Sequence, residues 1–344
     1  MYWIIFPILA ALAVIYILVC YIVYRCENKK MIDQINVATN IPYGEQSLAE
    51  MRKKQPQTEY FLYDENERAA DPKKADVKLY RFGIDKKTDF VLVCPGGGYG
   101  CCVLSTEGFP IAAKINELGY NAFILEYRTG KNSSLYAPLY DLARAVEFIQ
   151  THAEELNVNA ENYAVCGFSA GGNLIGLFGD INMGFQQNVT PPSALIMGYP
   201  WCNLNTKTWS VVDKIRFAGL NHGGHVYMLE NKKELFPTLL LPRHVSPEYP
   251  ATYIMHGTAD NLVPIKTHPD VFVEKLKENG IPVRYDRIPG ICHGIGLGEN
   301  TAAANWLDTA VEFWQQQNKA KQSRTDKIRQ IEYHQKSETV YAQP

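Results

Sequence analysis

Short runs of consecutive apolar residues alternate along the chain with stretches whose apolar residues recur at helical spacing. The short runs are typical of strands buried on both faces of a parallel sheet, and the spaced pattern is typical of helices that pack one face on such a sheet. The alternation therefore predicts an α/β fold with a mostly parallel central sheet and helices on both faces. The expected strands cover 77–82, 90–94, 121–127, 163–166, 194–199, 252–257 and 283–288, and the expected helices cover 110–118, 137–152, 271–279 and 302–316.

Three regions interrupt or flank this alternation. Residues 201–250 are rich in aromatic residues and glycine, and they are expected to form a small cap-like insertion over the carboxyl edge of the sheet, where ligands bind in such folds. Residues 25–75 are polar and mixed, which predicts a tether and edge segment ahead of a main domain over 76–316. Residues 317–344 are polar, which predicts a tail that is partly disordered or a solvated helix.

The N-terminal segment has a different character. Residues 1–24 carry no charged side chain and are almost entirely apolar. A helix of this length, at ~1.5 Å per residue, spans the hydrocarbon core of a bilayer. A cleaved signal peptide is the alternative, but no Lys or Arg precedes the apolar run, and the run ends in Tyr-Ile-Val-Tyr rather than in small residues. We therefore predict an uncleaved single-pass transmembrane anchor in the cell membrane. Arg25, Lys29 and Lys30 follow it directly and favour a cytoplasmic main domain, although three charges do not exclude the extracellular face.

Composition and charge narrow the function classes. The 344 residues are 46% hydrophobic and 20% charged, as in an ordinary globular protein with a sizeable core. The formal net charge of −2 gives no electrostatic basis for a nucleic-acid partner. The eight cysteines form no C-x-x-C pair and no Cys/His zinc spacing, so no metal site is expected. Their apolar or glycine-rich surroundings are typical of reduced cysteines and favour a reducing compartment or a membrane surface.

A candidate nucleophile lies between the expected strand at 163–166 and the helix after it. Gly167, Ser169 and Gly171 fit the pattern G-x-S-x-G, in which a serine occupies a sharp strand-to-helix turn. The crowded turn requires small neighbours, and it lifts the serine hydroxyl out of the sheet toward a base. A bare match is weak because glycine and serine are common, so the assignment depends on the rest of the chain.

A serine hydroxyl needs a base and a group that orients the base, and in α/β folds with this turn an acid and then a histidine follow the serine along the chain. Asp260 comes just after the expected strand at 252–257, and His293 comes just after the one at 283–288. The alternatives are an Asx-turn or helix-cap role for Asp260 and a structural or solvated role for His293. We favour Ser169, Asp260 and His293 as a catalytic triad, because each follows an expected strand in the required order. The other downstream histidines fit less well: His222, His225, His244 and His268 do not directly follow a core strand, and His256 precedes the acid.

A glycine-rich segment follows the expected strand at 90–94. The backbone N–H groups of Gly97 and Gly98, with that of Ala170 after the serine, are expected to form an oxyanion hole. A phosphate-binding loop or a simple turn is the alternative. Residues 95–100 fit neither G-x-G-x-x-G nor a G-K-S/T motif, which disfavours nucleotide binding.

From about residue 75 to about residue 315 the chain resembles α/β-hydrolases of the esterase/lipase type. It is similar to the small bacterial carboxylesterases and to acetyl-xylan-esterase-like enzymes. The matching stretches are PGGGY at 95–99, EGFP at 107–110, EYR at 126–128, GFSAGG at 167–172 and HGTAD at 256–260. Pro95 differs from the His of hormone-sensitive-lipase relatives, Asn173 from the His that acetylesterases often have, and Asn261 from a frequent second Asp. None of these three differences affects the predicted triad, but together they mean that the resemblance does not specify the substrate.

The resemblance implies a serine hydrolase that cleaves carboxylic esters, short-acyl esters and acetylated sugars among them, through an acyl-enzyme. It implies no metal and no cofactor, and it implies a small-molecule or carbohydrate ester as the partner. A membrane, contacted through the predicted N-terminal helix, is the other expected partner. The insertion and Tyr99 are expected to shape the acyl or alcohol pocket, with Trp201 as the first candidate contact, although a buried aromatic residue more often packs than binds. A serine peptidase of the same fold and a non-catalytic binding relative are the alternatives. Acyl and alcohol specificity and the oligomeric state stay open.

Overall fold

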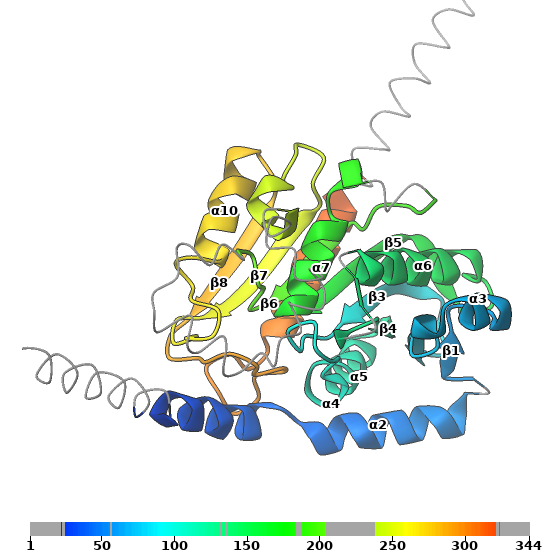
Figure 1. The fold of residues 1–344 in the computed structure, drawn as a ribbon, viewed down its shortest axis with the longest axis horizontal. Coiled ribbons are helices and arrows are strands. Elements are labelled where there is room, and N and C mark those ends of the chain that lie inside the picture. The colour runs from blue at the N-terminus through cyan, green and yellow to red at the C-terminus, as the bar shows by residue number, and fades with distance from the viewer. Residues whose placement is uncertain are drawn as a thin grey trace, which may run out of the picture.

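The computed structural model describes residues 22, 25–55, 57–130, 133–134, 136–183, 188–203, 238–320 and 323. An eight-stranded sheet runs through them in the order β1-β2-β4-β3-β5-β6-β7-β8 (Figure 1). The β1–β2 and β2–β4 pairs are antiparallel and the other pairs are parallel, so the predicted mostly parallel sheet is confirmed. The strands are β1 (Glu59–Phe61), β2 (Lys78–Phe82), β3 (Thr88–Cys94), β4 (Asn121–Glu126), β5 (Val158–Phe168), β6 (Ala194–Gly198), β7 (Ala251–Gly257) and β8 (Val283–Ile288).

The central strands are apolar throughout because both of their faces are covered. In β3, Phe90, Leu92 and Cys94 belong to one hydrophobic core, and Val91 and Val93 belong to the other. All five side chains are fully buried, and they show the two-residue alternation of a strand. At the sheet edge, β8 buries none of its residues completely.

Helices cover both faces of the sheet, as predicted (Figure 1). One core contains side chains of α6 (Ala137–Thr151), α7 (Ala170–Phe178) and α10 (Pro269–Glu278). The other contains side chains of α2 (Ile41–Lys54), α5 (Phe109–Glu117) and the helix over 306–320. This last helix begins later than the predicted 302, because 302–305 form a turn. The shorter helices are α3 (Glu65–Ala70), α4 (Leu104–Glu107), η1 (Pro72–Lys74), η3 (Ile181–Met183) and η5 (Leu241–Arg243).

The segment predicted as a tether, residues 25–75, is instead folded against the domain. Residues 25–38 are helical, α2 packs on α5, and β1 supplies the edge strand of the sheet. The α2–α5 contact is close because Gly44 has no side chain, since a Cβ there would lie 2.6 Å from the ring of Pro110. These helices differ from the prediction because each buries only a narrow apolar stripe, such as Leu48 of α2, within a polar segment.

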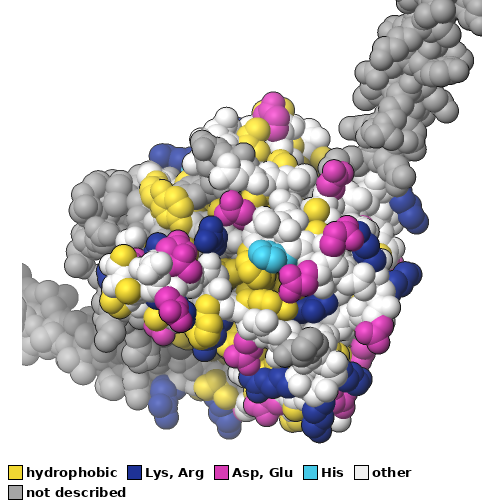
Figure 2. Space-filling view, turned by 90° about the vertical axis from the view of Figure 1, so that its right-hand side faces the viewer, with side chains coloured by type: hydrophobic (Ala, Val, Ile, Leu, Met, Phe, Trp, Pro, Cys, Tyr) yellow, Lys and Arg dark blue, Asp and Glu magenta, His cyan; other side chains and the backbone are white. Residues whose placement is uncertain are grey.

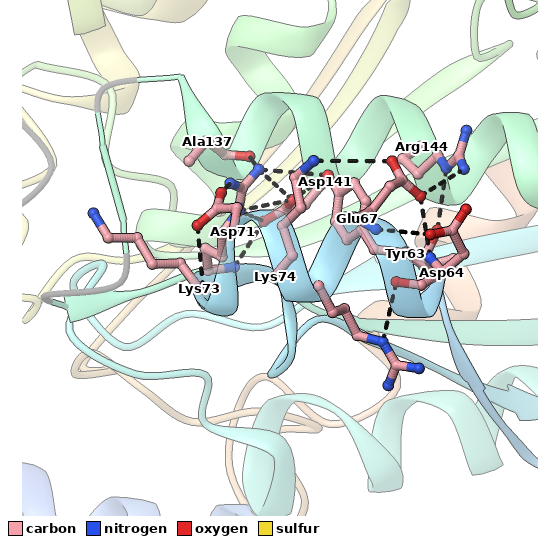
Figure 3. Close-up of polar contacts among 12 residues, drawn as sticks. Tyr63, Asp64, Glu67, Asp71, Lys73, Lys74, Ala137, Asp141 and Arg144 are labelled. Carbon is pink, nitrogen blue, oxygen red and sulfur yellow. Dashed lines mark hydrogen bonds and ion pairs between the residues drawn. The ribbon is translucent and has the colours of Figure 1, made fainter.

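A buried ion pair fixes the segment between β1 and α3 to α6. The Arg128 guanidinium donates to the Asp141 carboxylate at 2.7 Å, and the Tyr63 hydroxyl donates to the same carboxylate at 2.7 Å. Figure 3 shows Asp141 and Arg144 of α6 pointing toward Tyr63 and Glu67. The side of the molecule that carries α3, at the right in Figure 1, faces the viewer in Figure 2, where acidic and basic side chains lie intermingled.

Parts of three predicted regions lie outside the described residues. They are 1–21, 23 and 24 of the predicted anchor, 204–237 of the predicted insertion, and 321–322 and 324–344 of the predicted tail. Within the described residues, no helix has both the length and the apolar character that a membrane crossing needs. The first four residues of the predicted tail, 317–320, continue the last helix.

Candidate active site

Ser169 occupies the turn between β5 and α7. Its backbone has φ 50° and ψ −114°, a sparsely populated conformation for a residue with a side chain. Two backbone hydrogen bonds hold the turn: the Ser169 N–H donates to the Gly198 carbonyl, and the Trp201 N–H donates to the Ser169 carbonyl, both at 3.0 Å. Glycine is required at position 171, since a Cβ there would overlap the carbonyl oxygen of Cys94 in β3. The G-x-S-x-G pattern thus has the strained turn that the sequence predicted.

The three residues predicted as a triad lie within hydrogen-bonding distance of each other. His293 Nε2 is 2.9 Å from Ser169 Oγ, and His293 Nδ1 is 2.7 Å from Asp260 Oδ2. An ionised carboxylate only accepts hydrogen bonds, so Nδ1 carries the proton and donates to Asp260. Nε2 is then free of its proton and accepts the Ser169 hydroxyl. Ser169, Asp260 and His293 follow β5, β7 and β8, and the parallel pairing of these strands brings their carboxyl ends to one edge of the sheet.

Asp260 is held by several donors at once. Its Oδ1 accepts the backbone N–H groups of Leu262 at 3.0 Å and Val263 at 2.8 Å. The Asx-turn considered as an alternative is therefore present together with the contact to His293. On the other side, His256 Nε2 lies 3.3 Å from Asp260 Oδ2 and 2.8 Å from the Val263 carbonyl, to which it donates. Burial raises the pKa of Asp260, but the charge of His293 and hydrogen bonds from both histidines outweigh it and hold the pKa well below its usual range.

The surroundings of His293 favour its protonated form. Burial lowers the pKa of His293, but the charge and hydrogen bond of Asp260 and the charge of Glu107 outweigh burial and raise the pKa above its usual value. The ring of Tyr199 packs edge-on against the imidazole, with ring centroids 4.8 Å apart. The histidine is therefore oriented on two sides and is a stronger base than an exposed histidine.

The predicted oxyanion donors lie beside the serine. Gly97 and Gly98, with φ of 125° and 61°, line the same cavity as Ser169. A side chain at Gly97 would overlap the carbonyl of Cys101, so only glycine allows this loop its path. Within the part of the chain that the structure describes, the N–H groups of Gly97, Gly98 and Ala170 donate to no protein acceptor. They are thus available to a ligand oxygen.

A buried glutamate ties these parts together. Glu107, at the end of α4, accepts the Gly96 N–H at Oε2 and the Tyr199 hydroxyl at Oε1, both at 2.7 Å. The Tyr199 oxygen in turn accepts the Gly296 N–H at 3.0 Å. Burial raises the pKa of Glu107, against the lowering effects of the Tyr199 hydrogen bond, the His293 charge and the Gly96 hydrogen bond. One carboxylate therefore links the glycine loop to the loop that follows the histidine.

The cavity over Ser169 has a volume of about 360 Å³. Trp201, a predicted substrate contact, lines it, but Tyr99 does not. Tyr99 is fully buried behind Trp201, and its hydroxyl donates to Asn173 Oδ1 at 2.9 Å, so its role is packing. The cavity is lined by Met31, Ile35, Gly97, Gly98, Cys101, Val103, Thr106, Glu107, Ser169, Trp201, Leu262, Val263, His293 and Gly294.

Asn173, one of the departures from the resembling enzymes, lies under this cavity. Its amide donates to the carbonyls of Trp201 at 2.8 Å and Leu239 at 3.0 Å, while its oxygen accepts the Tyr99 hydroxyl. The side chain thus joins the helix after the serine to two segments of the predicted insertion, at Trp201 and at Leu239. Asn173 acts on the shape of the pocket rather than on the reacting atoms.

Five residues that contribute to this site were not identified from the sequence. Glu107 belongs to the matching stretch at 107–110, but its neighbours Ser105, Thr106 and Gly108 give no local signal of burial. Tyr199 and His256 end strands and look like core residues, while Met31 and Ile35 belong to the segment predicted as a tether. Tyr199, Met31 and Ile35 reach the site through contacts that are distant in sequence, so no local pattern marks them, whereas His256 lies only four residues before Asp260.

A second cavity, of about 680 Å³, lies away from the triad between α3 and α6 (Figure 3). Its charged lining residues bind one another, as Arg144 does with Glu67 and Glu147. Among the described residues, no cluster of His, Cys, Asp and Glu has the arrangement of a metal site.

Known proteins resemble the chain over its main domain. The BD-FAE family model matches residues 82–276, more than half of the chain. The chain is 29% identical over 238 residues to endo-1,4-beta-xylanase B of Butyrivibrio fibrisolvens, covering 66% of this chain and 35% of the xylanase. It is 23% identical over 209 residues to an acetylxylan esterase of Xylanibacter ruminicola, covering 59% of this chain and 40% of the esterase. The chain thus spans less than half the length of each of these curated relatives.

Solved structures share the fold. An acetyl ester-xyloside bifunctional hydrolase from Caldicellulosiruptor lactoaceticus superposes with a TM-score of 0.63 at 25% identity, covering 75% of this chain and 96% of that one. A carboxylesterase from Lactobacillus plantarum superposes with a TM-score of 0.59 at 19% identity, covering 70% of this chain and 93% of that one. These likenesses confirm the predicted α/β-hydrolase fold. Because the family model covers more than half of the sequence, the chain belongs to the BD-FAE family.

Proposed function

We propose that the chain is a serine esterase that hydrolyses carboxylic esters with short acyl groups, acetylated carbohydrates among them. The observation that carries this proposal is the position of His293 between Ser169 and Asp260, 2.9 Å from one and 2.7 Å from the other. A serine hydroxyl becomes a nucleophile at neutral pH when a base of this kind accepts its proton. The unoccupied N–H groups of the glycine loop supply the second requirement, a site for negative charge.

In the first half of the reaction, Ser169 Oγ attacks the carbonyl carbon while its proton passes to His293 Nε2. Asp260 stays ionised because its pKa is held low. It accepts the hydrogen bond from His293 Nδ1, on which the proton remains, and it stabilises the imidazolium. The carbonyl oxygen becomes an oxyanion that accepts hydrogen bonds from Gly97, Gly98 and Ala170. When the tetrahedral intermediate collapses, the alcohol leaves with the proton from Nε2, and the acyl group stays on Ser169.

In the second half, a water molecule gives its proton to His293 Nε2 and attacks the acyl carbonyl. The same N–H groups stabilise the second oxyanion. Collapse releases the carboxylic acid and returns the proton to Ser169 Oγ. Every proton is moved by His293, and none of these steps calls for a metal or a cofactor.

The size of the pocket and the names of the relatives support a short acyl group. A volume of about 360 Å³ lies at the lower end of the range of small-molecule sites. The acetylxylan esterase and the acetyl ester-xyloside hydrolase named above carry acetyl-ester activity in their names. An acetylated or otherwise short-acylated carbohydrate is the substrate class that fits both.

We also propose that residues 1–24 anchor the enzyme in the cell membrane as a single-pass helix. The support is the uncharged, apolar run itself, followed by Arg25, Lys29 and Lys30, which favour a cytoplasmic catalytic domain.

The direct test is labelling with a fluorophosphonate probe. Wild type and a Ser47→Ala control, whose serine lies on α2 away from the cavity, should both be labelled, and Ser169→Ala should not. Wild type should also hydrolyse p-nitrophenyl acetate and leave an aminoacyl p-nitroanilide intact. Folded wild type that takes up no label would refute the proposal, and cleavage of the anilide with no ester hydrolysis would replace the esterase with a peptidase.

A further inference from the structure

The helix over residues 25–38 lies outside the stretch that the family model matches. Figure 1 shows it in dark blue, against the orange segment that follows β8. Met31, Gln34, Ile35 and Ala38 are the covered positions of its last two turns, while residues 32, 33, 36 and 37 are exposed. The covered positions have the spacing of one helical face, so the helix presents a defined surface to the domain.

This surface forms part of the catalytic pocket. Met31 and Ile35 line the cavity that contains Ser169 and His293. The contact is tight at Gly294, because a Cβ there would lie 3.2 Å from Ile35 Cδ1. Ile35 is therefore packed beside the residue that follows the catalytic histidine, and Met31 lines the same cavity.

The helix also binds the backbone next to that histidine. The Gln34 side chain donates from Nε2 to the Gly290 carbonyl at 2.9 Å, and its Oε1 accepts the Cys292 N–H at 2.7 Å. One amide group thus holds the loop on the N-terminal side of His293. Farther along, the Glu299 N–H donates to the Ala38 carbonyl at 3.0 Å, which holds the same loop at its other end.

We propose that the helix over 25–38 is a working part of the active site: Met31 and Ile35 close the acyl side of the pocket and limit it to short acyl groups, and Gln34 positions the loop that carries His293. This inference rests on the proposed esterase function. It assigns substrate selection to an element that lies N-terminal to the matched family region.

The polarity of the lining residues indicates whether this helix faces the acyl group or the alcohol group of the ester. Met31 and Ile35 line the cavity together with Leu262 and Val263, and all four side chains are apolar. A carbohydrate alcohol carries hydroxyl groups that lose hydrogen bonds against an apolar lining, whereas an acyl methyl or a short chain does not. Apart from Ser169 and His293, the polar side chains that line the cavity are Thr106 and Glu107. The apolar lining that the helix contributes therefore suits the acyl group.

The selectivity test uses p-nitrophenyl esters of acetate, butyrate, hexanoate and octanoate with the full-length chain. Ile35→Ala and Met31→Ala should raise the ratio of kcat/KM for hexanoate over acetate by about tenfold or more, since each methylene in an apolar pocket changes selectivity by that order. Ile32→Ala is the matched control, because Ile32 is 52% exposed on the outer face of the same helix. Ile35→Phe should act in the opposite direction and reduce the activity on butyrate.

The positioning role of Gln34 is tested separately. Gln34→Ala should lower kcat for p-nitrophenyl acetate by about tenfold, since the histidine must be held in a productive orientation, while KM changes less than twofold. The rate of fluorophosphonate labelling should fall in parallel. Gln46→Ala is the control, because Gln46 is exposed and its amide donates to Glu50 within α2.

The outcomes separate this inference from the proposed function. If wild type hydrolyses esters and Ile35→Ala keeps the chain-length preference of Ile32→Ala, the helix does not select the acyl group and the inference is wrong. The same holds if Ile35→Phe leaves the activity on butyrate unchanged, or if Gln34→Ala matches Gln46→Ala in kcat. If wild type hydrolyses no ester and takes up no label, the proposed function fails first and the inference falls with it.

Discussion

A substitution at Glu107 tests whether this buried side chain holds the glycine loop and the loop after His293 in place. The substitution Glu107→Gln keeps the size of the side chain and removes its charge. The carboxylate now accepts two hydrogen bonds, from Gly96 and from Tyr199. The amide has one acceptor oxygen, so one of these two contacts loses its acceptor. A hydrogen bond to a charged group contributes about 1.5–3 kcal/mol, so kcat should fall about 10- to 100-fold if the glycine loop shifts.

The same substitution has a signature in the pH profile. The charge of Glu107 contributes to the raised pKa of His293, so its removal lowers that pKa. Activity requires neutral His293, and the acidic limb of kcat/KM should therefore move to lower pH in Glu107→Gln. Initial rates with p-nitrophenyl acetate between about pH 5 and about pH 9 measure both effects.

The stability of Glu107→Gln should also depend on pH in its own way. Burial raises the pKa of Glu107, so its contribution to stability is fully present below the ordinary Glu pKa and is lost as the pH rises through the raised value. Glutamine does not ionise, and the melting temperature of the variant relative to that of wild type should therefore rise as the pH is raised from about 4 to about 9. Glu117→Gln is the matched control, because Glu117 also accepts a tyrosine hydroxyl, from Tyr43 at 2.6 Å, but on the surface. A kcat within twofold of this control, or an acidic limb that stays in place, would refute the reasoning.

Three further predictions concern the acid, the turn and the anchor. Asp260→Asn should lower kcat on the order of 10³- to 10⁴-fold, because the amide favours the wrong tautomer of His293. The pKa of Asp260 is depressed in the folded state, so its carboxylate stabilises wild type above the ordinary Asp pKa, and this stability is lost on acidification. When the pH is lowered below about 4, the melting temperature should therefore fall less for Asp260→Asn than for wild type. Gly171→Ala should lower the free energy of unfolding in urea by about 3 kcal/mol or more, because its Cβ would overlap a β3 carbonyl, while Gly119→Ala, with open space and a φ of 89°, should cost only about 1–2 kcal/mol of backbone strain. The full-length chain should stay with the membrane fraction through alkaline carbonate extraction, and its release would contradict the proposed anchor.

The grouping of Ser169, Asp260 and His293 in space could be predicted because its signals are local. Ser169 and Asp260 follow strands that apolar runs mark, His293 follows the last predicted strand at 283–288, and parallel strands end at the same edge of a sheet. The turn pattern around Ser169 reports a steric need for small residues that no longer-range contact overrides. These three positions therefore followed from spacing and chain order alone.

The supports of the site could not be predicted in this way. Gln34 meets the loop before His293 across 256 residues of sequence, and Met31 and Ile35 lie in a polar segment that gives no strong periodic signal. Tyr99 shows the converse difficulty. An aromatic residue next to a glycine loop gives the same local signal whether it packs or binds, and only its complete burial decides for packing.

Because residues 25–38 form a helix, they limit how far the catalytic pocket can lie from a membrane that holds the proposed anchor. If residues 1–24 lie in a bilayer as proposed, the chain leaves it through a helix of about 21 Å, at ~1.5 Å per residue, whose far end is bonded to the loops of the catalytic pocket. A flexible tether over 25–75 would allow the pocket to sample distances of about 40 Å. With the helix, the pocket would instead stay at a fixed, short distance from the membrane surface. Esters would then be cleaved close to the bilayer rather than throughout the surrounding solution.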